Sequence, residues 1–161
     1  NILTFISAYA ESKFLTSHFS IIAVGGGDFN RFELAEFKRL NIDDKIIQID
    51  ANDEKLAMCY RAAACLVYPS LYEGFGLPII EAMASGCMVI STREGSLSEV
   101  GLGLDTPFEY GNSESLTYAI ISALDDFLAR RINHVAINKH VNNFSWKRTA
   151  LETFEIYNRI S

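Results

Sequence analysis

Two glutamates stand eight residues apart in the segment Glu73-Gly-Phe-Gly-Leu-Pro-Ile-Ile-Glu81, near the middle of the chain. An ionised carboxylate only accepts hydrogen bonds, and its two oxygens can receive two adjacent hydroxyl groups at once. The neighbouring hydroxyls of a ribose or hexose ring meet this requirement. The pair therefore predicts a site that binds a ligand rich in hydroxyl groups.

The residues between the two glutamates predict a sharp turn followed by a helix. Gly74 and Gly76 allow backbone conformations that are closed to other residues. Pro78 suits the first turn of a helix, because an N–H at that position would have no partner within the helix. We expect a helix over residues 78–85, and Gly86 is placed to end it in a left-handed cap.

A helix that begins here would present free backbone N–H groups at its positive end. The groups in question belong to Phe75, Gly76 and Leu77, and such a cluster binds phosphate readily. Glu73 and Glu81 would flank this anion site, where neutral hydroxyls are their natural partners. A ligand with both a diphosphate and a sugar satisfies both parts, so the segment predicts a nucleotide-sugar site.

Strand-like runs alternate with helical patterns along the chain, which is typical of an α/β fold with a parallel sheet covered by helices on both faces. The expected strands are 20–24, 45–49, 65–68, 88–91 and, more weakly, 102–105. The expected helices are 1–16, 31–40, 53–63, 78–85, 113–130, 131–142 and 146–160. In the helix after Asn112, apolar residues at three- and four-residue spacing predict a face packed on the sheet.

Length and composition indicate one globular domain. The chain has 161 residues, of which 49% are hydrophobic, so it can bury a sizeable core.

The formal net charge of the chain is -6 and there is no clustered basic face, which argues against a nucleic-acid partner. The apolar runs are too short to span a bilayer, and the first residues lack the pattern of a signal peptide, so we expect a cytoplasmic location.

The cysteines and histidines do not indicate a metal site. Cys59, Cys65 and Cys87 lack paired spacing and are interpreted as reduced core residues. His134 and His140 are six residues apart, whereas ligands that share a helical face are three or four apart. We expect neither a metal nor another cofactor.

Several further polar or aromatic residues have ordinary structural interpretations. Ser96 and Glu99 fit a capping box at the start of a short helix, whereas the same spacing between Ser70 and Glu73 is followed by glycine and is taken as accidental. Arg93 lies after a strand and could approach a ligand, but a solvated loop arginine is the simpler interpretation. Trp146 begins a helix whose later apolar residues share one face, so we expect its side chain to pack in the core.

The segment 73–81 resembles the donor-site signature of the retaining GT-B-fold "group 1" (family-4) glycosyltransferases. The resemblance extends to Ile22-Ala-Val-Gly25-Gly-Gly27, which is similar to a glycine turn of that family, and to Asn143-Phe-Ser-Trp146, which is similar to the opening of its last helix. It covers nearly the whole chain and implies a Rossmann-like sheet that forms half of a GT-B fold.

The resemblance also implies roles for individual residues. Glu81 would hold the ribose hydroxyls, and Glu73 would act as the catalytic residue that holds the hydroxyls of the transferred sugar. The backbone from Gly74 through Phe75 and Gly76 to Leu77 would contact the sugar and the phosphates. Gly25 and Gly26, with Gly27, would lie beside the phosphates and base. The donor would be a UDP- or GDP-sugar, transferred with retention of configuration, without a metal.

Members of this family place a strand and a turn with an Arg and a Lys before the helix that residues 1–9 resemble. This first strand is missing here, and Lys13 does not replace the basic pair. We therefore expect residues 1–161 to be the nucleotide-sugar-binding C-terminal domain of a longer hexosyltransferase. Its partner would be an N-terminal acceptor domain, so the chain alone would not complete transfer. The family commonly builds polysaccharides and glycolipids, which suits peripheral association with the inner face of a membrane.

Alternative functions remain open at this point. A nucleotide-sugar epimerase would share the architecture but needs further acid–base side chains in the cleft. A non-catalytic nucleotide-sugar-binding module would fit the missing basic pair. A dinucleotide-binding oxidoreductase is weakly supported, because Asn30 stands where the third glycine of the G-x-G-x-x-G pattern belongs.

Overall fold

The computed structural model describes residues 1–129 and 131–160. The helices are α1 (Ile2–Glu11), α2 (Lys13–His18), α3 (Arg31–Arg39), α4 (Asp53–Ala62), α5 (Leu77–Ala84), α6 (Ser96–Gly101), α7 (Ser113–Leu128), α8 (His134–Val141) and α9 (Trp146–Ile160), with a 3-10 turn, η1, at Asp43–Lys45. The strands are β1 (Ile21–Val24), β2 (Ile46–Ile49), β3 (Cys65–Tyr68), β4 (Met88–Ser91) and β5 (Thr106–Pro107).

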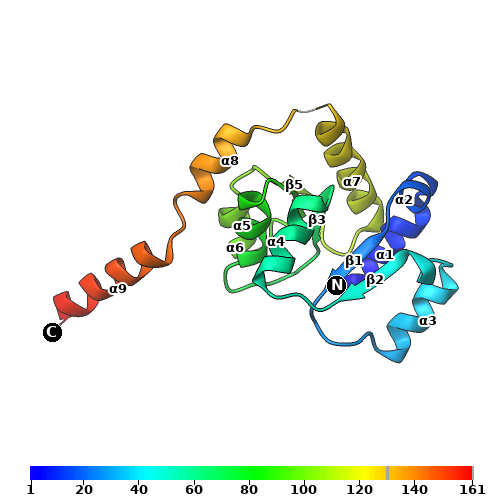
Figure 1. Ribbon diagram of the computed structural model, residues 1–161, viewed down its shortest axis with the longest axis horizontal. Coiled ribbons are helices and arrows are strands. Elements are labelled where there is room, and N and C mark those ends of the chain that lie inside the picture. Colours follow the sequence, from blue (N-terminus) through cyan, green and yellow to red (C-terminus); the bar gives the residue numbers. More distant parts are fainter. Residues whose placement is uncertain (130, 161) are drawn as a thin grey trace.

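The strand pairs of the described residues are parallel, as the alternation of strands and helices predicts. β1 pairs with β2, where Ile21 lies opposite Ile46, and β4 lies between β3 and β5. The strands therefore form two separate sheets, of two and three strands, rather than one continuous sheet. Figure 1 shows the β1–β2 sheet and α3 beside the rest of the domain.

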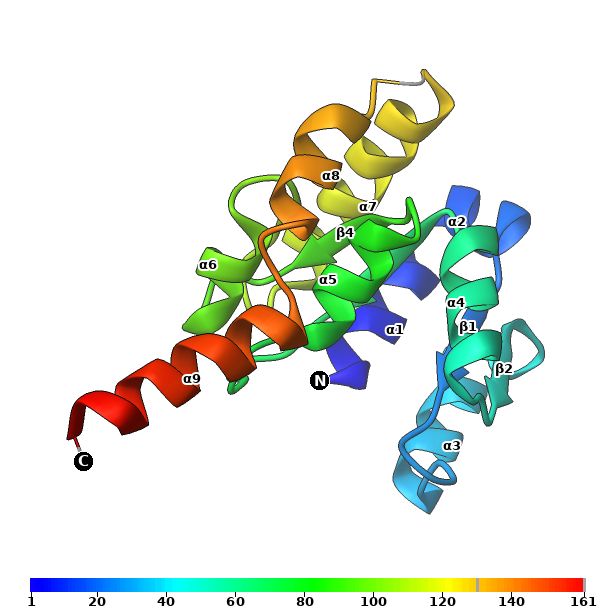
Figure 2. The same cartoon turned by 60° about the vertical axis from the view of Figure 1, so that its left-hand side comes forward.

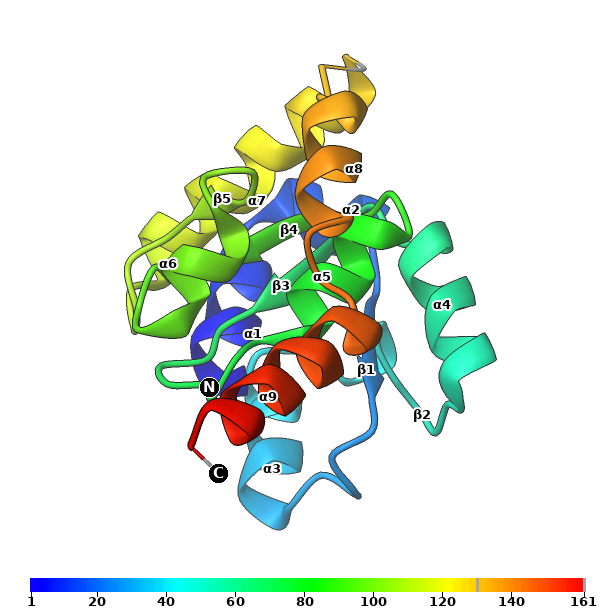
Figure 3. The ribbon, with the colours of Figure 1, turned by 90° about the vertical axis from the view of Figure 1, so that its left-hand side faces the viewer.

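Helices cover both faces of the three-stranded sheet, so the predicted α/β architecture is confirmed. α7 contacts β3, β4 and β5 on one face and also packs on α1, whereas α5 contacts β3 and β4 on the other face (Figure 3). Successive residues of a strand point to opposite faces, and the two neighbours in β4 show this directly. Ile90 belongs to the core with α1 and α7, and Val89 belongs to the core with α5 and α6.

β1 and β3 line the same cavity but do not pair with each other. Every residue of both strands contributes to the lining, and Ile22 and Val24 of β1 are 51% and 37% exposed. Unpaired backbone groups at a strand edge can accept another strand. The edges of β1 and β3 that face the cavity are therefore able to pair with a further strand.

The structure corrects two of the predicted elements. The expected helix over 1–16 is broken at Ser12, which has an extended backbone and whose hydroxyl oxygen caps α2 by accepting from the N–H of Leu15. The expected strand over 102–105 is instead β5 at Thr106–Pro107, because Leu102 ends α6 in the left-handed conformation and Gly103 follows with positive φ. Pro107 fits an edge strand, where no N–H is needed.

The expected helix ends are otherwise reproduced within a few residues. Gly86 follows α5 with φ of +78°, as expected for a left-handed cap, and Asn52 caps α4 by accepting from the N–H of Lys55. The predicted boundary between the helices over 113–130 and 131–142 includes residue 130, which lies outside the described residues. On either side of it, α7 ends at Leu128 and α8 begins at His134.

α9 projects away from the rest of the domain (Figures 1 and 2), and none of its residues is buried. The predicted core packing of Trp146 is therefore wrong, since this side chain is 77% exposed. The helix does carry large apolar side chains at helical spacing, but periodicity cannot tell which surface covers them. The exposed apolar side chains of α9 are Trp146, Leu151, Phe154, Ile156, Tyr157 and Ile160.

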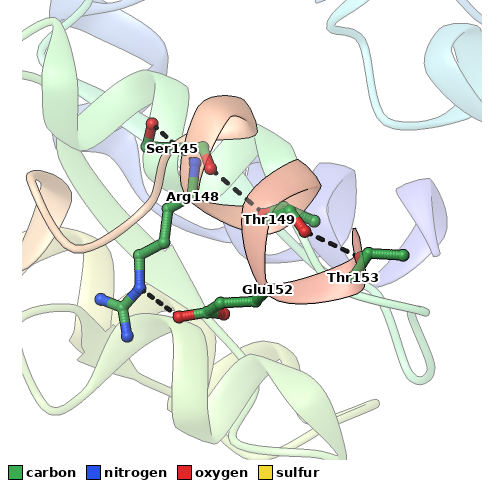
Figure 4. Close-up of polar contacts among 5 residues, drawn as sticks. All are labelled: Ser145, Arg148, Thr149, Glu152 and Thr153. Carbon is green, nitrogen blue, oxygen red and sulfur yellow. Dashed lines mark hydrogen bonds and ion pairs between the residues drawn. The ribbon is translucent and has the colours of Figure 1, made fainter. Parts of the chain in front are cut away.

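Hydrogen bonds between near neighbours support α9 (Figure 4). Arg148 donates to Glu152 at 2.7 Å, and Thr149 and Thr153 donate back to the carbonyls four residues earlier, those of Ser145 and Thr149. An exposed ion pair of this kind contributes only a few tenths of a kcal/mol. These contacts support the helix itself, but they do not fix its position on the domain.

The start of α5 is packed tightly against α6. Gly76 has φ of +102°, and a Cβ placed there would lie 2.8 Å from Cδ2 of the buried Leu97. A Cβ at Gly74, two residues earlier, would have nothing within 4 Å. Of these two positions, only position 76 requires glycine, because its φ is positive and because a Cβ there would clash with Leu97.

Amide hydrogen exchange will test the division into two sheets. β4 is largely buried and paired on both sides, whereas β1 is paired only with β2. We expect the amides of β4 to exchange much more slowly than those of β1, because opening β1 breaks fewer contacts. Equal protection of the two strands in exchange followed by mass spectrometry would contradict this arrangement.

Gly76→Ala should lower the free energy of unfolding by about 2 kcal/mol, since it combines left-handed strain with a clash in a packed region. Gly74→Ala is the matched control and should have a much smaller effect. Chemical denaturation of both variants measures the difference. Similar destabilisation by the two substitutions would show that Leu97 does not constrain this turn.

Candidate functional site

The loop between β3 and α5 carries Glu73 and is held by the segment that follows β4. The Thr92 hydroxyl donates to the carbonyl of Ser70 at 2.6 Å, and the Ser96 hydroxyl donates to the carbonyl of Glu73 at 2.8 Å. Thr92 is fully buried. Two hydroxyl groups from one segment thus fix both ends of the turn that presents the Glu73 carboxylate.

This bracing corrects two interpretations of the sequence. Ser96 does not form a capping box with Glu99, because α6 has Gly95 as its N-cap and no side-chain cap bond; the hydroxyl reaches the Glu73 loop instead. Ser70 and Glu73 do not start a helix, as expected. Their spacing nevertheless has a role, because Ser70 Oγ donates to Glu73 Oε1 at 2.8 Å.

α5 begins directly after this loop. Gly76 is the N-cap in the left-handed conformation, Leu77 is the first helical residue and Pro78 follows it. The first N–H groups of a helix have no partner within it, and the helix dipole adds positive potential there. This geometry can bind a phosphate group, as the sequence predicts for the backbone of Phe75, Gly76 and Leu77.

Glu81 lies one turn further along α5, where it meets a tyrosine from α4. The Tyr60 hydroxyl lies 3.2 Å from Glu81 Oε2 and donates to it. Tyr60 is 8% exposed, whereas Glu81 is exposed to solvent. Burial, followed by the neighbouring Glu81 carboxylate, raises the pKa of Tyr60, so the phenol stays protonated and remains a donor.

Tyr68, the last residue of β3, links the two glutamates. Burial first, and then a hydrogen bond with Glu73 and the charges of Glu73 and Glu81, raise the pKa of Tyr68 to about 12. The phenol therefore lies within electrostatic reach of both carboxylates. Glu73 and Glu81 are thereby parts of one connected polar cluster, in which each carboxylate accepts from its own hydroxyl donors.

The glycine turn after β1 is anchored to β2. Gly25, Gly26 and Gly27 have φ of +72°, +81° and +72°. The N–H of Gly25 donates to the carbonyl of Ile49 at 3.2 Å, and the side-chain amide of Gln48 donates to the carbonyl of Gly27. Because the turn has no side chains of its own, a ligand can approach its backbone closely.

A cavity of about 1020 Å³ connects these elements. Its lining includes the turn from Gly25 to Gly27, Tyr60, Tyr68 and Glu81. Glu73 and the backbone from Gly74 to Leu77 are not part of the lining, although Tyr68, which does line the cavity, lies within electrostatic reach of Glu73. The structure thus brings Glu81 and the glycine turn to one cavity and leaves Glu73 outside its lining.

Tyr60, Tyr68, Thr92 and Ser96 were not identified as site residues from the sequence. For Tyr68 a signal exists, since it ends a strand directly before the glycine-rich loop. Tyr60 comes from the preceding helix, and Thr92 acts from the end of the next strand, so both contacts depend on packing between elements. Local spacing does not report such contacts.

The remaining candidates lie outside this cluster. Arg93 is exposed beside Thr92. His140 is buried and its Nε2 lies 2.7 Å from the carbonyl of Val100, which gives it a structural contact. Cys87 is buried and Cys65 partly so, all three cysteines are free, and burial raises the pKa of the Cys65 thiol to about 12.

The described part of the chain offers no cluster of metal ligands and no membrane-spanning helix. Within 1–129 and 131–160, no group of three or more His, Cys, Asp or Glu side chains could hold a metal ion. No helix in those ranges has both the length and the apolar character needed to cross a bilayer.

Comparison with known proteins identifies relatives of this chain. Residues 1–126 match the family described as glycosyl transferases group 1. The chain is 35% identical over 105 residues to the O-antigen chain mannosyltransferase B of Escherichia coli, an alignment that covers 65% of this chain and 28% of the relative. The aligned part therefore spans less than a third of the length of that protein.

Solved structures share the fold. Sucrose-phosphate synthase from Thermosynechococcus elongatus superposes with a TM-score of 0.85 at 28% identity, covering 99% of this chain and 42% of that one. The pneumococcal O-GlcNAc transferase GtfA, solved in complex with UDP and GlcNAc, has a TM-score of 0.75 at 16% identity and covers 99% of this chain and 33% of its own. Because the family match covers most of the chain and the fold agrees, this protein belongs to the group 1 glycosyltransferases.

Proposed function

We propose that this chain binds a nucleotide-diphosphate sugar and serves as the donor domain for retaining transfer of that sugar to an acceptor glycan or lipid. The observation that carries the proposal is that Glu81 of α5, Tyr68 and the glycine turn at Gly25 to Gly27 line one cavity, with Glu73 in electrostatic reach of Tyr68. Among solved proteins of this fold, GtfA holds UDP and GlcNAc, which supports a ligand of the same chemical class.

Each part of such a donor has a matching group in the structure. The N-terminus of α5 offers backbone N–H groups and positive potential for the diphosphate. Glu81 lines the cavity and can accept from the two ribose hydroxyls, and the turn at Gly25 to Gly27 leaves room for the phosphates and base. Glu73, which lies outside the lining, would hold the hydroxyls of the transferred sugar.

The catalytic contribution of these residues is positioning and electrostatic stabilisation. Glu73 would hold the sugar so that its anomeric carbon faces the acceptor, and the amides at the start of α5 would stabilise the negative charge that develops on the leaving diphosphate. We infer that the leaving phosphate assists attack from the same face, which retains the anomeric configuration. No metal is required in this scheme.

We further propose that the chain works together with an acceptor-binding domain in a longer protein. The matched relative is more than three times as long as the aligned part, and α9 exposes an apolar side that its own domain does not cover. The name of the Escherichia coli relative supports a role in polysaccharide synthesis, and we place the reaction in the cytoplasm, at the inner membrane face where the acceptor is a lipid.

A thermal-shift screen tests the proposal. The complete protein that contains this chain should melt at a higher temperature with either UDP and UDP-glucose or GDP and GDP-mannose, because a ligand that binds only the native state stabilises it by mass action. At a concentration 100 times its Kd, a ligand adds about 2.7 kcal/mol. Unchanged melting with all four compounds would reject donor binding, and binding without any transfer would favour the non-catalytic alternative.

Substitution of the two glutamates should separate the parts of the donor. Glu81→Ala should weaken binding of both the nucleoside diphosphate and the intact donor by about 1 to 3 kcal/mol, since the ribose contact is common to both ligands. Glu73→Ala should spare the nucleoside diphosphate and reduce sugar transfer. Isothermal titration calorimetry and a transfer assay measure the two effects.

The exposed Glu11 at the end of α1 provides the matched control for this pair. Glu11→Ala should change neither binding nor transfer. If Glu73→Ala reduced the affinity for nucleoside diphosphate as much as Glu81→Ala does, the proposed division of roles would be incorrect.

A further inference from the structure

We infer that Tyr60 and Tyr68 are positioning residues, and that their phenol groups fix the Glu81 and Glu73 carboxylates in the orientation that receives the hydroxyls of the donor. This inference rests on the proposed function, because it assigns a role to the residues that hold its two carboxylates. Neither tyrosine needs to touch the reacting atoms.

The contact between Tyr60 and Glu81 joins two helices. Tyr60 belongs to α4 and Glu81 to α5, and the helices pack against each other (Figure 2). Tyr60 is buried, and its hydroxyl donates to Glu81 Oε2 at 3.2 Å. A phenylalanine would fill the same apolar space, so the hydroxyl is the part of this side chain that packing does not explain.

Tyr68 occupies the corresponding position for Glu73. It ends β3, lines the cavity with Tyr60, and lies within electrostatic reach of both Glu73 and Glu81. Ser70 also donates to Glu73, with 2.8 Å between its Oγ and Glu73 Oε1. Glu73 therefore accepts from the neutral hydroxyl of Ser70 and has the phenol of Tyr68 nearby.

The choice of neutral donors matters for a carboxylate that must bind a ligand. An arginine would occupy both oxygens in a bidentate ion pair, whereas a phenol occupies one lone pair and leaves the others for hydroxyls. The ion pairs of the described residues all lie elsewhere, on exposed parts of the chain. They are Arg39–Glu36, Arg131–Asp126, Arg148–Glu152 and Arg159–Glu155.

The phenols also reduce the electrostatic repulsion between the two carboxylates. Two negative charges near one ligand disfavour each other, and an O–H dipole directed at one of them lowers this cost. Tyr68 is within electrostatic reach of both Glu73 and Glu81, so it can serve the pair as a shared donor. A phenol is protonated near neutral pH, and burial together with the carboxylates raises the pKa values of both tyrosines further, so both remain donors.

The test uses Tyr60→Phe and Tyr68→Phe in the complete protein, with UDP, GDP and their glucose and mannose conjugates as probes. Tyr60→Phe should weaken binding of the active nucleoside diphosphate about three- to tenfold, the effect of one lost hydrogen bond. Tyr68→Phe should leave that affinity within about twofold and lower kcat for transfer by about three- to tenfold. Tyr118→Phe, on the exposed outer side of α7, is the control and should change neither value.

A double-mutant cycle separates positioning from general stability. Tyr60→Phe should have no further effect in a Glu81→Ala background, because the carboxylate that it orients is gone. The same holds for Tyr68→Phe in a Glu73→Ala background. A purely structural tyrosine would give additive losses together with a lower melting temperature of the ligand-free protein.

The outcomes distinguish this inference from the proposed function. If Glu81→Ala weakens binding and Tyr60→Phe does not, or if the effects are additive, the positioning role is overturned while donor binding stands. If Glu81→Ala itself leaves all the probes unaffected, the proposed function fails, and the positioning role fails with it.

Discussion

The site depends on how two carboxylates are held close to the positive end of a helix without being neutralised by it. Within the described residues, Tyr60 donates to Glu81 and Ser70 donates to Glu73 through neutral hydroxyls, and the phenol of Tyr68 lies within electrostatic reach of both carboxylates. A neutral donor fixes a carboxylate and leaves most of its hydrogen-bonding capacity free, whereas a cation would consume it. The acidic pair can therefore be ordered in advance and still accept the hydroxyls of a ligand.

This ordering requires support from beyond the loop that carries Glu73. Thr92 and Ser96 hold the loop backbone from the segment after β4, and Leu97 fills the space beside Gly76. The turn is consequently defined by a neighbouring strand and helix rather than by its own residues alone. Such bracing keeps a loop-borne carboxylate as well positioned as one on a helix, which a donor site needs if it works by orientation.

The sequence predicted the parts of this structure that local rules control. The strands β1 to β4, the glycine turn, the start of α5 and the cap at Gly86 follow from apolar runs, from glycine at positions of positive φ and from contacts between near neighbours. The errors occurred where distant segments decide. Ser96 satisfies a capping pattern, yet its hydroxyl bonds with the carbonyl of Glu73, 23 residues away, since that contact forms only after α6 packs beside the loop.

The same reasoning explains why the bounds of α9 were predicted correctly while the burial of its apolar side was predicted wrongly. Its helical span follows from residues within one or two turns of each other, whereas the partner of its apolar side does not. Trp146 has the spacing of a core residue and is nevertheless 77% exposed. β1 shows the same limitation in a strand, because Ile22 and Val24 are apolar but exposed beside the cavity that separates β1 from β3. In both places the sequence shows an apolar pattern, but what covers it depends on distant parts of the structure. In this domain the apolar side chains of α9 and two of those in β1 remain exposed.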